Sequence, residues 1–425
     1  MILQRNIMNE NKLLIVIPTW ERCQAIERLL SEEVEVLSEF KIDICIYDSS
    51  RGDETFKLVC EYIKKHKNVL YERVDDAIPS NVKYFDICRK ISDSKYKYLW
   101  IIQDHLIIKR EAIQHIINAL DTCADFYYLD MFSNMYNQKV ENDLNSFAIK
   151  SAWMLTRYGT AVFKIDSFLK GIEWDGKIDK WLNDKTINFS HVGLIFERLI
   201  EMNNAKVESV SFKREQFYDF MRFQPVAWDG ELLRICLECW GMTIEKLPNT
   251  YRKEQIMQSQ DALFISNIKL LSLKSEHRYG VNEYERFKEW ICKIYPERDK
   301  EFKDIAYLPG EIAEKRYFGK IFDAINKARE KQAPVYVYGA GRHGTELASY
   351  LDKKKILFNG LLVSTKEGNP NCINDHYVYE ASEKIRNGNA LIIIAVAKGS
   401  VDLISKMIDD ISDNPNDVLI LDEII

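Results

Sequence analysis

The chain has 425 residues, of which 46% are hydrophobic and 29% charged, a composition typical of packed globular proteins of two or three domains. Lys and Arg number 59 against 65 for Asp and Glu, so no overall basic field favours nucleic acid as a partner. Apolar runs such as residues 390–397 are far shorter than the roughly 20 residues that cross a bilayer. The N-terminus lacks the apolar region of a signal peptide, and we expect a cytoplasmic protein.

Apolar runs alternate with amphipathic helical stretches in the N-terminal part of the chain, which is the pattern of a parallel sheet built from β-α-β units. The expected fold class is therefore α/β. The predicted strands are 13–17, 42–47, 68–73, 96–102 and 126–130, and the predicted helices are 21–37, 55–66, 82–92 and 112–119.

The rest of the chain predicts two further parts. Residues 231–332 are rich in Lys, Glu and aromatic residues and read as a mainly helical connector. Residues 333–425 begin with a strand at 335–338, a glycine-rich turn and a helix at 345–351, followed by strands at 356–363 and 391–396. This order predicts a small C-terminal Rossmann-like domain, so the domains are expected at 1–230, 231–332 and 333–425.

Three polar segments follow predicted strands of the N-terminal sheet: Pro18–Arg22, Asp48–Asp53 and Gln103–His105. The carboxyl ends of parallel strands meet at one edge of a sheet, where ligands bind. We therefore expect these three loops to share one site. Sugar transfer from a nucleotide needs a clamp for the base, positive charge for the diphosphate and a base for the acceptor hydroxyl.

Three stretches of the sequence resemble, in order and spacing, the motifs of family 2 glycosyltransferases, which have the GT-A fold. They are Leu14–Arg22, Ile44–Ser50 with Asp53 and Thr55, and Tyr98–His105. The resemblance covers roughly residues 12–230. It implies that Asp48 contacts a uracil-type base, that Asp104 stands at the metal-binding motif, and that Asn81 and Lys83 lie near the diphosphate. The donor-binding residues that it implies are Pro18, Thr19, Glu21, Arg22, Asp48, Asn81, Lys83, Gln103 and Asp104.

The metal motif departs from the family pattern, because Gln103–His105 supplies one carboxylate where the family usually has two or three. Asp104 and His105 remain the expected ligands, and the pair suits Mn²⁺ better than Mg²⁺, which prefers oxygen ligands. Without a metal, Lys83 or Arg22 has to carry the phosphate charge.

The resemblance also implies a catalytic base about ninety residues after the metal motif, near the start of a helix. Ser190 is the expected N-cap of that helix and places His191 in its first turn. His191 is the first candidate for the base, or alternatively a last metal ligand, with Glu197 and Asp184 in reserve. A packing role for His191 is an equal alternative.

The segment Lys213–Phe223 mixes basic and aromatic residues, as an acceptor-binding wall or a membrane-interface loop does. Packing of the aromatic side chains in the core, with the charged residues in solvent, is the favoured alternative.

Gly339, Gly341 and Gly344 form a GxGxxG pattern between a strand and a helix, the context of a phosphate-binding turn. The acidic residue that contacts the ribose of NAD is missing after the next strand, where Val363–Lys366 stands. This end resembles the Rossmann-like modules of bacterial sugar-modifying proteins. Three interpretations of the glycine turn therefore stay open: it binds a nucleotide sugar, it binds another phosphate ligand, or it is a structural turn without a ligand.

The sequence thus predicts a glycosyltransferase of the hexosyltransferase class that moves a sugar from a nucleotide sugar, most simply a UDP-sugar, to a surface glycan, lipid-linked or glycoprotein acceptor, with inversion. Surface polysaccharide synthesis or protein glycosylation would use such an enzyme, at the inner face of the membrane if the acceptor is lipid-linked. The alternatives are a non-catalytic nucleotide-sugar-binding regulator or scaffold, and an oxidoreductase or epimerase acting through the glycine turn. Whether the chain forms a homo-oligomer stays open.

Overall fold

The computed structural model describes residues 13–74, 78–133, 135–213, 216–219, 229–260, 265–366, 369–396 and 400–421. The chain divides into two compact units. Unit 1 lies within Met1–Met221 and Arg234–Gln260, and unit 2 within Arg222–Leu233 and Asp261–Ile425. The expected helical connector, 231–332, is therefore divided between the two units and does not form a unit of its own.

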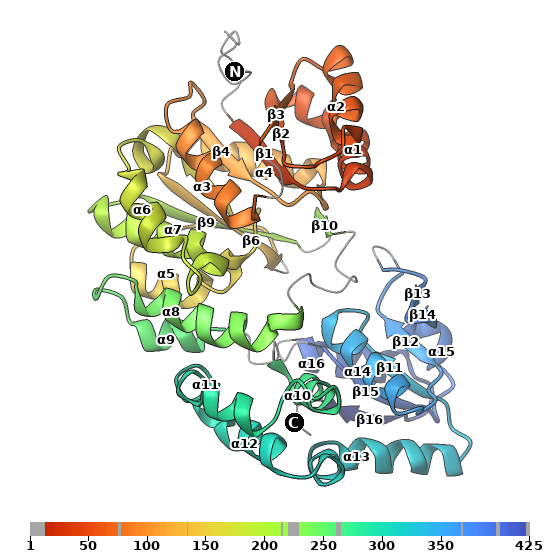
Figure 1. The fold of residues 1–425 in the computed structure, drawn as a ribbon. Coiled ribbons are helices and arrows are strands. Elements are labelled where there is room, and N and C mark those ends of the chain that lie inside the picture. Colours follow the sequence, from red (N-terminus) through yellow and green to blue (C-terminus); the bar gives the residue numbers. More distant parts are fainter. Residues whose placement is uncertain are drawn as a thin grey trace. The chain divides into compact units, whose positions relative to one another are not determined.

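Unit 1 is built on an eight-stranded sheet with the order β3-β2-β1-β4-β8-β6-β9-β7 (Figure 1). The first four strands in this order are parallel, β8 is antiparallel to both its neighbours, and β7 is antiparallel to β9. The strands are β1 (Leu13–Thr19), β2 (Ile42–Asp48), β3 (Val69–Arg73), β4 (Tyr98–Ile101), β6 (Phe126–Ser133), β7 (Asn137–Glu141), β8 (Ala161–Lys164) and β9 (Val207–Lys213), and a separate antiparallel pair joins β5 (Leu106–Ile108) to β10 (Phe217–Asp219).

Helices cover both faces of the parallel half of this sheet (Figure 1). Alternate residues of β1, including Leu13 and Ile15, join a core with Ile26 and Leu29 of α1, and α3 packs against β1 from its other face. The helices of unit 1 are α1 (Cys23–Glu39), α2 (Glu54–Lys65), α3 (Ser80–Ile91), α4 (Arg110–Leu120), α5 (Leu144–Ser151), α6 (Trp174–Trp181), α7 (Ser190–Glu201), α8 (Trp240–Glu245) and α9 (Lys253–Gln258).

Unit 2 combines a helical segment with a six-stranded sheet of order β13-β14-β12-β11-β15-β16, parallel except for β13. Its helices are α10 (Asn267–Ser275), α11 (Val281–Ile294), α12 (Asp299–Tyr307), α13 (Gly310–Glu330), α14 (Arg342–Lys353), α15 (Ala381–Lys384) and α16 (Val401–Ile411). Its strands are β11 (Val335–Tyr338), β12 (Gly360–Val363), β13 (Cys372–Ile373), β14 (His376–Glu380), β15 (Leu391–Ile394) and β16 (Asp417–Ile420).

The predicted α/β class is confirmed, and the parallel-rich sheet of unit 1 is consistent with a GT-A-like fold. The predicted strands and helices of the first 130 residues are all present, with ends shifted by a few residues. Two details were wrong. The strand predicted at 356–363 begins only at Gly360, and Ser190 is the first residue of α7 while Phe189 is its N-cap. Among the described helices, none has the length and apolar character needed to cross a membrane.

Candidate functional site

The three polar loops predicted to converge do lie at one edge of the unit 1 sheet. Strands β1 and β2 are parallel and in register, with Thr19 beside Asp48, and β4 runs parallel to β1 on its other side. The amide of Ile102 donates to Val16 O (3.1 Å) and continues this pairing beyond β4. The segments that follow β1, β2 and β4 therefore start from neighbouring strand ends.

The turn between β1 and α1 is fastened to the loop after β2. The Glu21 amide donates to Ser50 Oγ (2.8 Å), and the Glu21 carboxylate accepts from the Arg51 amide (2.8 Å). Glu21 has a φ of 52°, a left-handed conformation that is uncommon for residues other than glycine and clusters at functional sites. These two hydrogen bonds hold the turn in this conformation.

Asp48 is fully buried and organises the loop that follows it. Its Oδ1 accepts from the amide (2.9 Å) and the hydroxyl (2.6 Å) of Ser50, and its Oδ2 accepts from Tyr71 Oη (2.9 Å). A carboxylate with 0% exposure that already accepts three hydrogen bonds does not present itself to a ligand from solvent. Asp48 therefore fixes the conformation of the loop that follows β2 and does not offer its carboxylate to a ligand in solvent.

Arg73, at the end of β3, clamps the same loop. Its guanidinium donates to the carbonyl oxygens of Ser50, Arg51 and Gly52 at 3.0 to 3.1 Å, and pairs with Asp53 at 2.6 Å. Neither Arg73 nor Tyr71 was among the predicted site residues. Both residues stand at the end of the predicted strand 68–73, and this position is the sequence signal by which they could have been found.

Asp104 is tied to the β1 turn by both of its oxygens. Thr19 Oγ1 donates to Oδ2 (2.9 Å), and Arg22 pairs with Oδ1 (2.9 Å). The Asp104 side chain is 6% exposed and that of Arg22 is 42% exposed. The predicted metal position is thus filled by an arginine-carboxylate pair.

This donor set does not fit a divalent ion. A metal bound through Asp104 would have to compete with a guanidinium for the same oxygen, and His105, half-buried, is the only other predicted ligand. Within the residues that the structure describes, no group of three or more His, Cys, Asp or Glu side chains is arranged to hold a metal. Sites for Mn²⁺ and Mg²⁺ usually have more oxygen ligands than this one carboxylate provides.

Lys83 is a buried residue that contacts the end of β1, next to the Thr19–Asp104 hydrogen bond. Its ammonium group donates to Thr19 O (2.6 Å), and the residue is 3% exposed. Burial lowers the pKa of Lys83 to about 8, although the charges of Asp48 and Asp104 act in the opposite direction. The lysine expected near the diphosphate therefore supports the end of β1 from inside.

The remaining predicted donor residues lie around this edge. Pro18 precedes Thr19 in β1 and is half-buried, as is Gln103 after β4. Asn81, in the first turn of α3, accepts a hydrogen bond from Tyr158 Oη (2.8 Å). No contact of these side chains singles out a ligand.

His191 is in the first turn of α7, as predicted, but in a packed environment. It is 2% exposed, and its ring lies 5.1 Å from the rings of Tyr84 and Tyr158, centre to centre. Its Nε2 is 3.1 Å from Leu155 O, while Nδ1 is buried without a partner. Burial lowers the pKa of His191 to about 4, so the imidazole is neutral and only weakly basic.

The two reserve candidates for the base are placed differently. Glu197 accepts from Lys180 (2.6 Å) and Trp181 (2.7 Å) and pairs with Lys177 (3.0 Å). Burial raises its pKa, but these hydrogen bonds outweigh that effect and lower it. Asp184 is exposed in the loop before α7, and its carbonyl accepts from Arg234 (3.3 Å). Within the described part of the chain, none of the three candidates forms a hydrogen bond with Asp104, Thr19 or Arg22.

The glycine turn of unit 2 has the predicted position between β11 and α14. Gly339 has a φ of 119°, and a Cβ there would lie 2.6 Å from Ala395 O. A Cβ on Gly344 would lie 1.8 Å from Gly339 O, whereas one on Gly341 would meet nothing within 4 Å. Two of the three glycines are therefore explained by close packing, of the turn on the segment after β15 for Gly339 and of α14 on the turn for Gly344, which needs no ligand.

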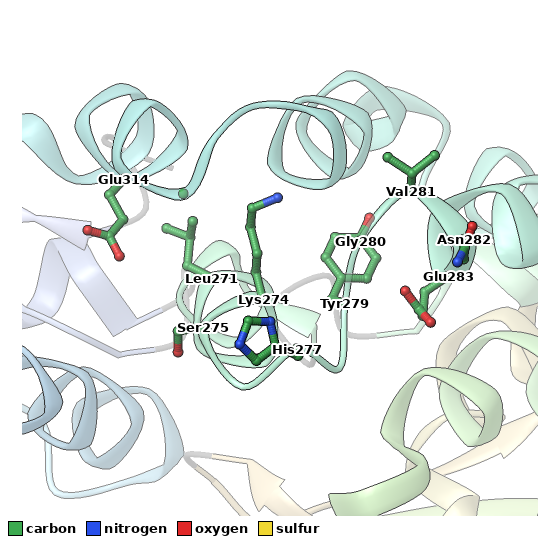
Figure 2. Close-up of a pocket in the computed structure, with 11 residues that line it drawn as sticks. Leu271, Lys274, Ser275, His277, Tyr279, Gly280, Val281, Asn282, Glu283 and Glu314 are labelled. Atoms are coloured by element: carbon green, nitrogen blue, oxygen red, sulfur yellow. The ribbon is translucent and has the colours of Figure 1, made fainter.

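Unit 2 also contains an open cavity of about 490 Å³ between α10, the start of α11 and the start of α13 (Figure 2). Two of its polar side chains are engaged at its walls, because Lys274 donates to Ala306 O (2.9 Å) and Tyr279 to Phe302 O (2.8 Å). None of the predicted site residues lines it. The lining residues are Leu271, Lys274, Ser275, His277, Tyr279, Gly280, Val281, Asn282, Glu283, Gly310 and Glu314.

No protein-family model and no curated protein matches the chain. Among solved structures, TarS 1–349 from S. aureus is 13% identical, with a TM-score of 0.45, over 69% of this chain and 83% of that one. The same fragment with UDP-GlcNAc has a TM-score of 0.41 at 13% identity, over 69% and 84%. The mannosyltransferase PcManGT from Pyrobaculum calidifontis, with GDP-Man and Mn²⁺, has a TM-score of 0.38 at 12% identity, over 73% and 88%. At these values the matches assign neither a family nor an activity.

Proposed function

We propose that unit 1 binds a nucleotide sugar at the edge formed by Thr19–Arg22, Asp48–Asp53 and Asp104, and transfers the sugar to an acceptor hydroxyl. The observation that carries this proposal is that side-chain hydrogen bonds and an ion pair join the loops to one another. Glu21 is joined to Ser50 and Arg51, and Thr19 and Arg22 are joined to Asp104. Loops held rigidly at the carboxyl ends of parallel strands form a preorganised ligand site.

The reaction is a displacement at the anomeric carbon of the donor. The acceptor oxygen forms a bond to that carbon, the bond to the diphosphate oxygen breaks, and the nucleoside diphosphate leaves with the electron pair. The hydroxyl proton passes to a base, for which His191, Glu197 and Asp184 remain the proposals. The resemblance of the loop motifs favours a UDP-sugar as donor and inversion at the anomeric carbon.

The acceptor side is proposed to include the segment that begins at Lys213. Of this segment, residues 213 and 216–219 are described, and 214–215 and 220–223 lie outside the described residues. Tyr218 pairs with Ile107 and Asp219 with Leu106, directly after His105. This pairing brings the segment to the Gln103–His105 loop, where it can border a glycan, lipid-linked or glycoprotein acceptor, the second of these with peripheral membrane contact.

A second candidate function is non-catalytic binding of a nucleotide sugar, for regulation or as a scaffold. The environments of the proposed bases favour it. His191 is buried among aromatic rings, and Glu197 is held by two lysines and an indole. Donor binding without transfer or hydrolysis is the result that this alternative predicts.

A ligand panel tests the proposal. Thermal shifts with UDP, GDP, CMP, several UDP-sugars and NAD(H) are measured for the full chain. Hydrolysis is then measured for the nucleotide sugars that bind. The proposal predicts a shift with nucleoside diphosphates and their sugars. A shift with NAD(H) alone would instead direct attention to the glycine turn at Gly339–Gly344.

A further inference from the structure

The cluster at the end of β1 contains two cations and two carboxylates that differ in exposure. Asp48, Asp104 and Lys83 are 0%, 5% and 3% exposed, whereas the Arg22 side chain is 42% exposed. The buried charges compensate one another inside the protein. Arg22 is the member of the cluster that reaches solvent, so the cluster presents positive charge outward.

Arg22 is also held in a defined position. Its Nη1 pairs with Asp104 Oδ1, and Asp104 is itself fixed by Thr19. A guanidinium has five N–H donors in a planar fork that matches phosphate oxygens. An arginine anchored by a buried carboxylate loses less side-chain freedom when it binds a ligand than a mobile one does.

The start of α1 contributes backbone partial charges of the same sign, although the carboxylates of Glu27, Glu54 and Asp48 also act on its first residue, Cys23. The helix begins at Cys23, directly after Arg22, with no side-chain cap and no acidic residue in its first turn. The first amides of a helix carry partial positive charge. By itself this feature specifies no ligand, but it has the same sign as the anchored guanidinium beside it.

We propose that Arg22, anchored by Asp104, binds the diphosphate of the nucleotide in place of a divalent metal ion. The inference rests on the proposed function and specifies how that site holds its donor. Lys83 is a positioning residue in this arrangement, because its ammonium group holds the Thr19 carbonyl rather than reaching the ligand. Donor binding by this protein is therefore independent of divalent cations.

Calorimetric titration of the full chain with UDP and GDP, in EDTA and in Mn²⁺, tests the inference. Wild type is expected to bind with the same affinity in both buffers. Arg22→Ala is expected to weaken nucleoside diphosphate binding about 10- to 100-fold, the usual effect of losing a hydrogen bond to a charged group. Arg22→Lys should recover only part of this, because an ammonium cannot reproduce the fork.

Two controls separate loss of the contact from loss of the fold. Uridine and guanosine lack the diphosphate and should bind wild type and Arg22→Ala alike. Arg28→Ala removes an exposed arginine of α1 that pairs with Glu32, and should leave UDP and GDP binding unchanged.

Each contrary result has a distinct meaning. Binding of UDP or GDP by wild type only in Mn²⁺ would overturn the inference and leave the proposed function standing. Undiminished UDP and GDP binding by Arg22→Ala in EDTA would also overturn it. Failure of UDP, GDP and their sugars to bind in either buffer would overturn the proposed function and, with it, the inference.

Discussion

Both units have neighbouring parallel strands with loops at their carboxyl ends, but the two edges are built differently. In unit 1 the loops are joined by charged and polar side chains around Asp48 and Asp104. In unit 2 the corresponding turn is shaped by the backbone of Gly339 and Gly344. An edge organised by buried charge is costly to keep without a function, whereas a glycine turn is explained by packing alone.

The largest effect should come from the glycine turn. Gly344→Ala places a Cβ 1.8 Å from Gly339 O, and we expect a loss of about 3 kcal/mol or more in the free energy of unfolding, at the upper end of overpacking effects. Gly341→Ala is the matched control, since its Cβ meets nothing within 4 Å. Urea unfolding of both variants measures the difference. Equal stability of the two would show that this turn is not close-packed.

The buried carboxylate of unit 1 comes next. Asp48→Ala leaves the Ser50 amide and Tyr71 hydroxyl without their buried acceptor and removes a charge near Lys83, and we expect a loss of about 3 kcal/mol. Asp53→Ala removes the exposed partner of Arg73 and should cost less than about 1 kcal/mol. If Asp48→Ala costs no more than Asp53→Ala in urea unfolding, the edge is not organised by buried charge.

A smaller, pH-dependent effect is expected at His191. Burial lowers its pKa to about 4, below an unfolded value of about 6.5. The folded state therefore binds fewer protons than the unfolded state between these values, and its stability falls as the pH falls through that range. His191→Phe should reduce the loss of stability between pH 7 and pH 4.5 by about 2 kcal/mol. Urea unfolding at both pH values checks this, and parallel losses in wild type and variant would contradict it.

The smallest effect concerns the Arg73 clamp. Arg73→Met keeps an unbranched, though shorter, side chain and removes the hydrogen bonds to the carbonyls of Ser50, Arg51 and Gly52. We expect faster hydrogen exchange in residues 49–53, with a loss of about 1 kcal/mol in overall stability because the contact is largely exposed. Lys139→Met, which removes the pair with Glu141 on β7 at the other end of the sheet, should leave exchange in this loop unchanged. The clamp would be unsupported if both variants gave wild-type exchange at 49–53.

Sequence periodicity predicted β1, β2, β3, β4 and β6 of unit 1 and β11, β12 and β15 of unit 2, because apolar patterns are local and each of these buried strands carries its own. It did not predict β7, β8 and β9 of unit 1 or β13, β14 and β16 of unit 2. It also missed β5 and β10, whose three residues each are too few for a pattern. It also extended the strand at 356–363 too far towards its start. There Asn359 is bonded by its side chain and backbone to Val335, a long-range contact that no local pattern reveals.

The order of the motifs predicted that Asp48 and Asp104 lie at one edge of the sheet, because parallel strands fix which ends meet. It did not predict the contacts of these side chains. Whether a carboxylate is open to solvent or paired depends on side chains distant in sequence, such as Tyr71 for Asp48. The pairing of Arg22 with Asp104, 82 residues apart, is of this kind, and it fills the expected metal position with an ion pair.

The most direct test of nucleotide binding by unit 1 is hydrogen exchange of the full chain with and without UDP, resolved by peptides. We expect added protection in peptides covering residues 18–22 and 48–53, with no change over 339–344. Protection confined to 339–344 would contradict it and move the nucleotide site to the glycine turn of unit 2.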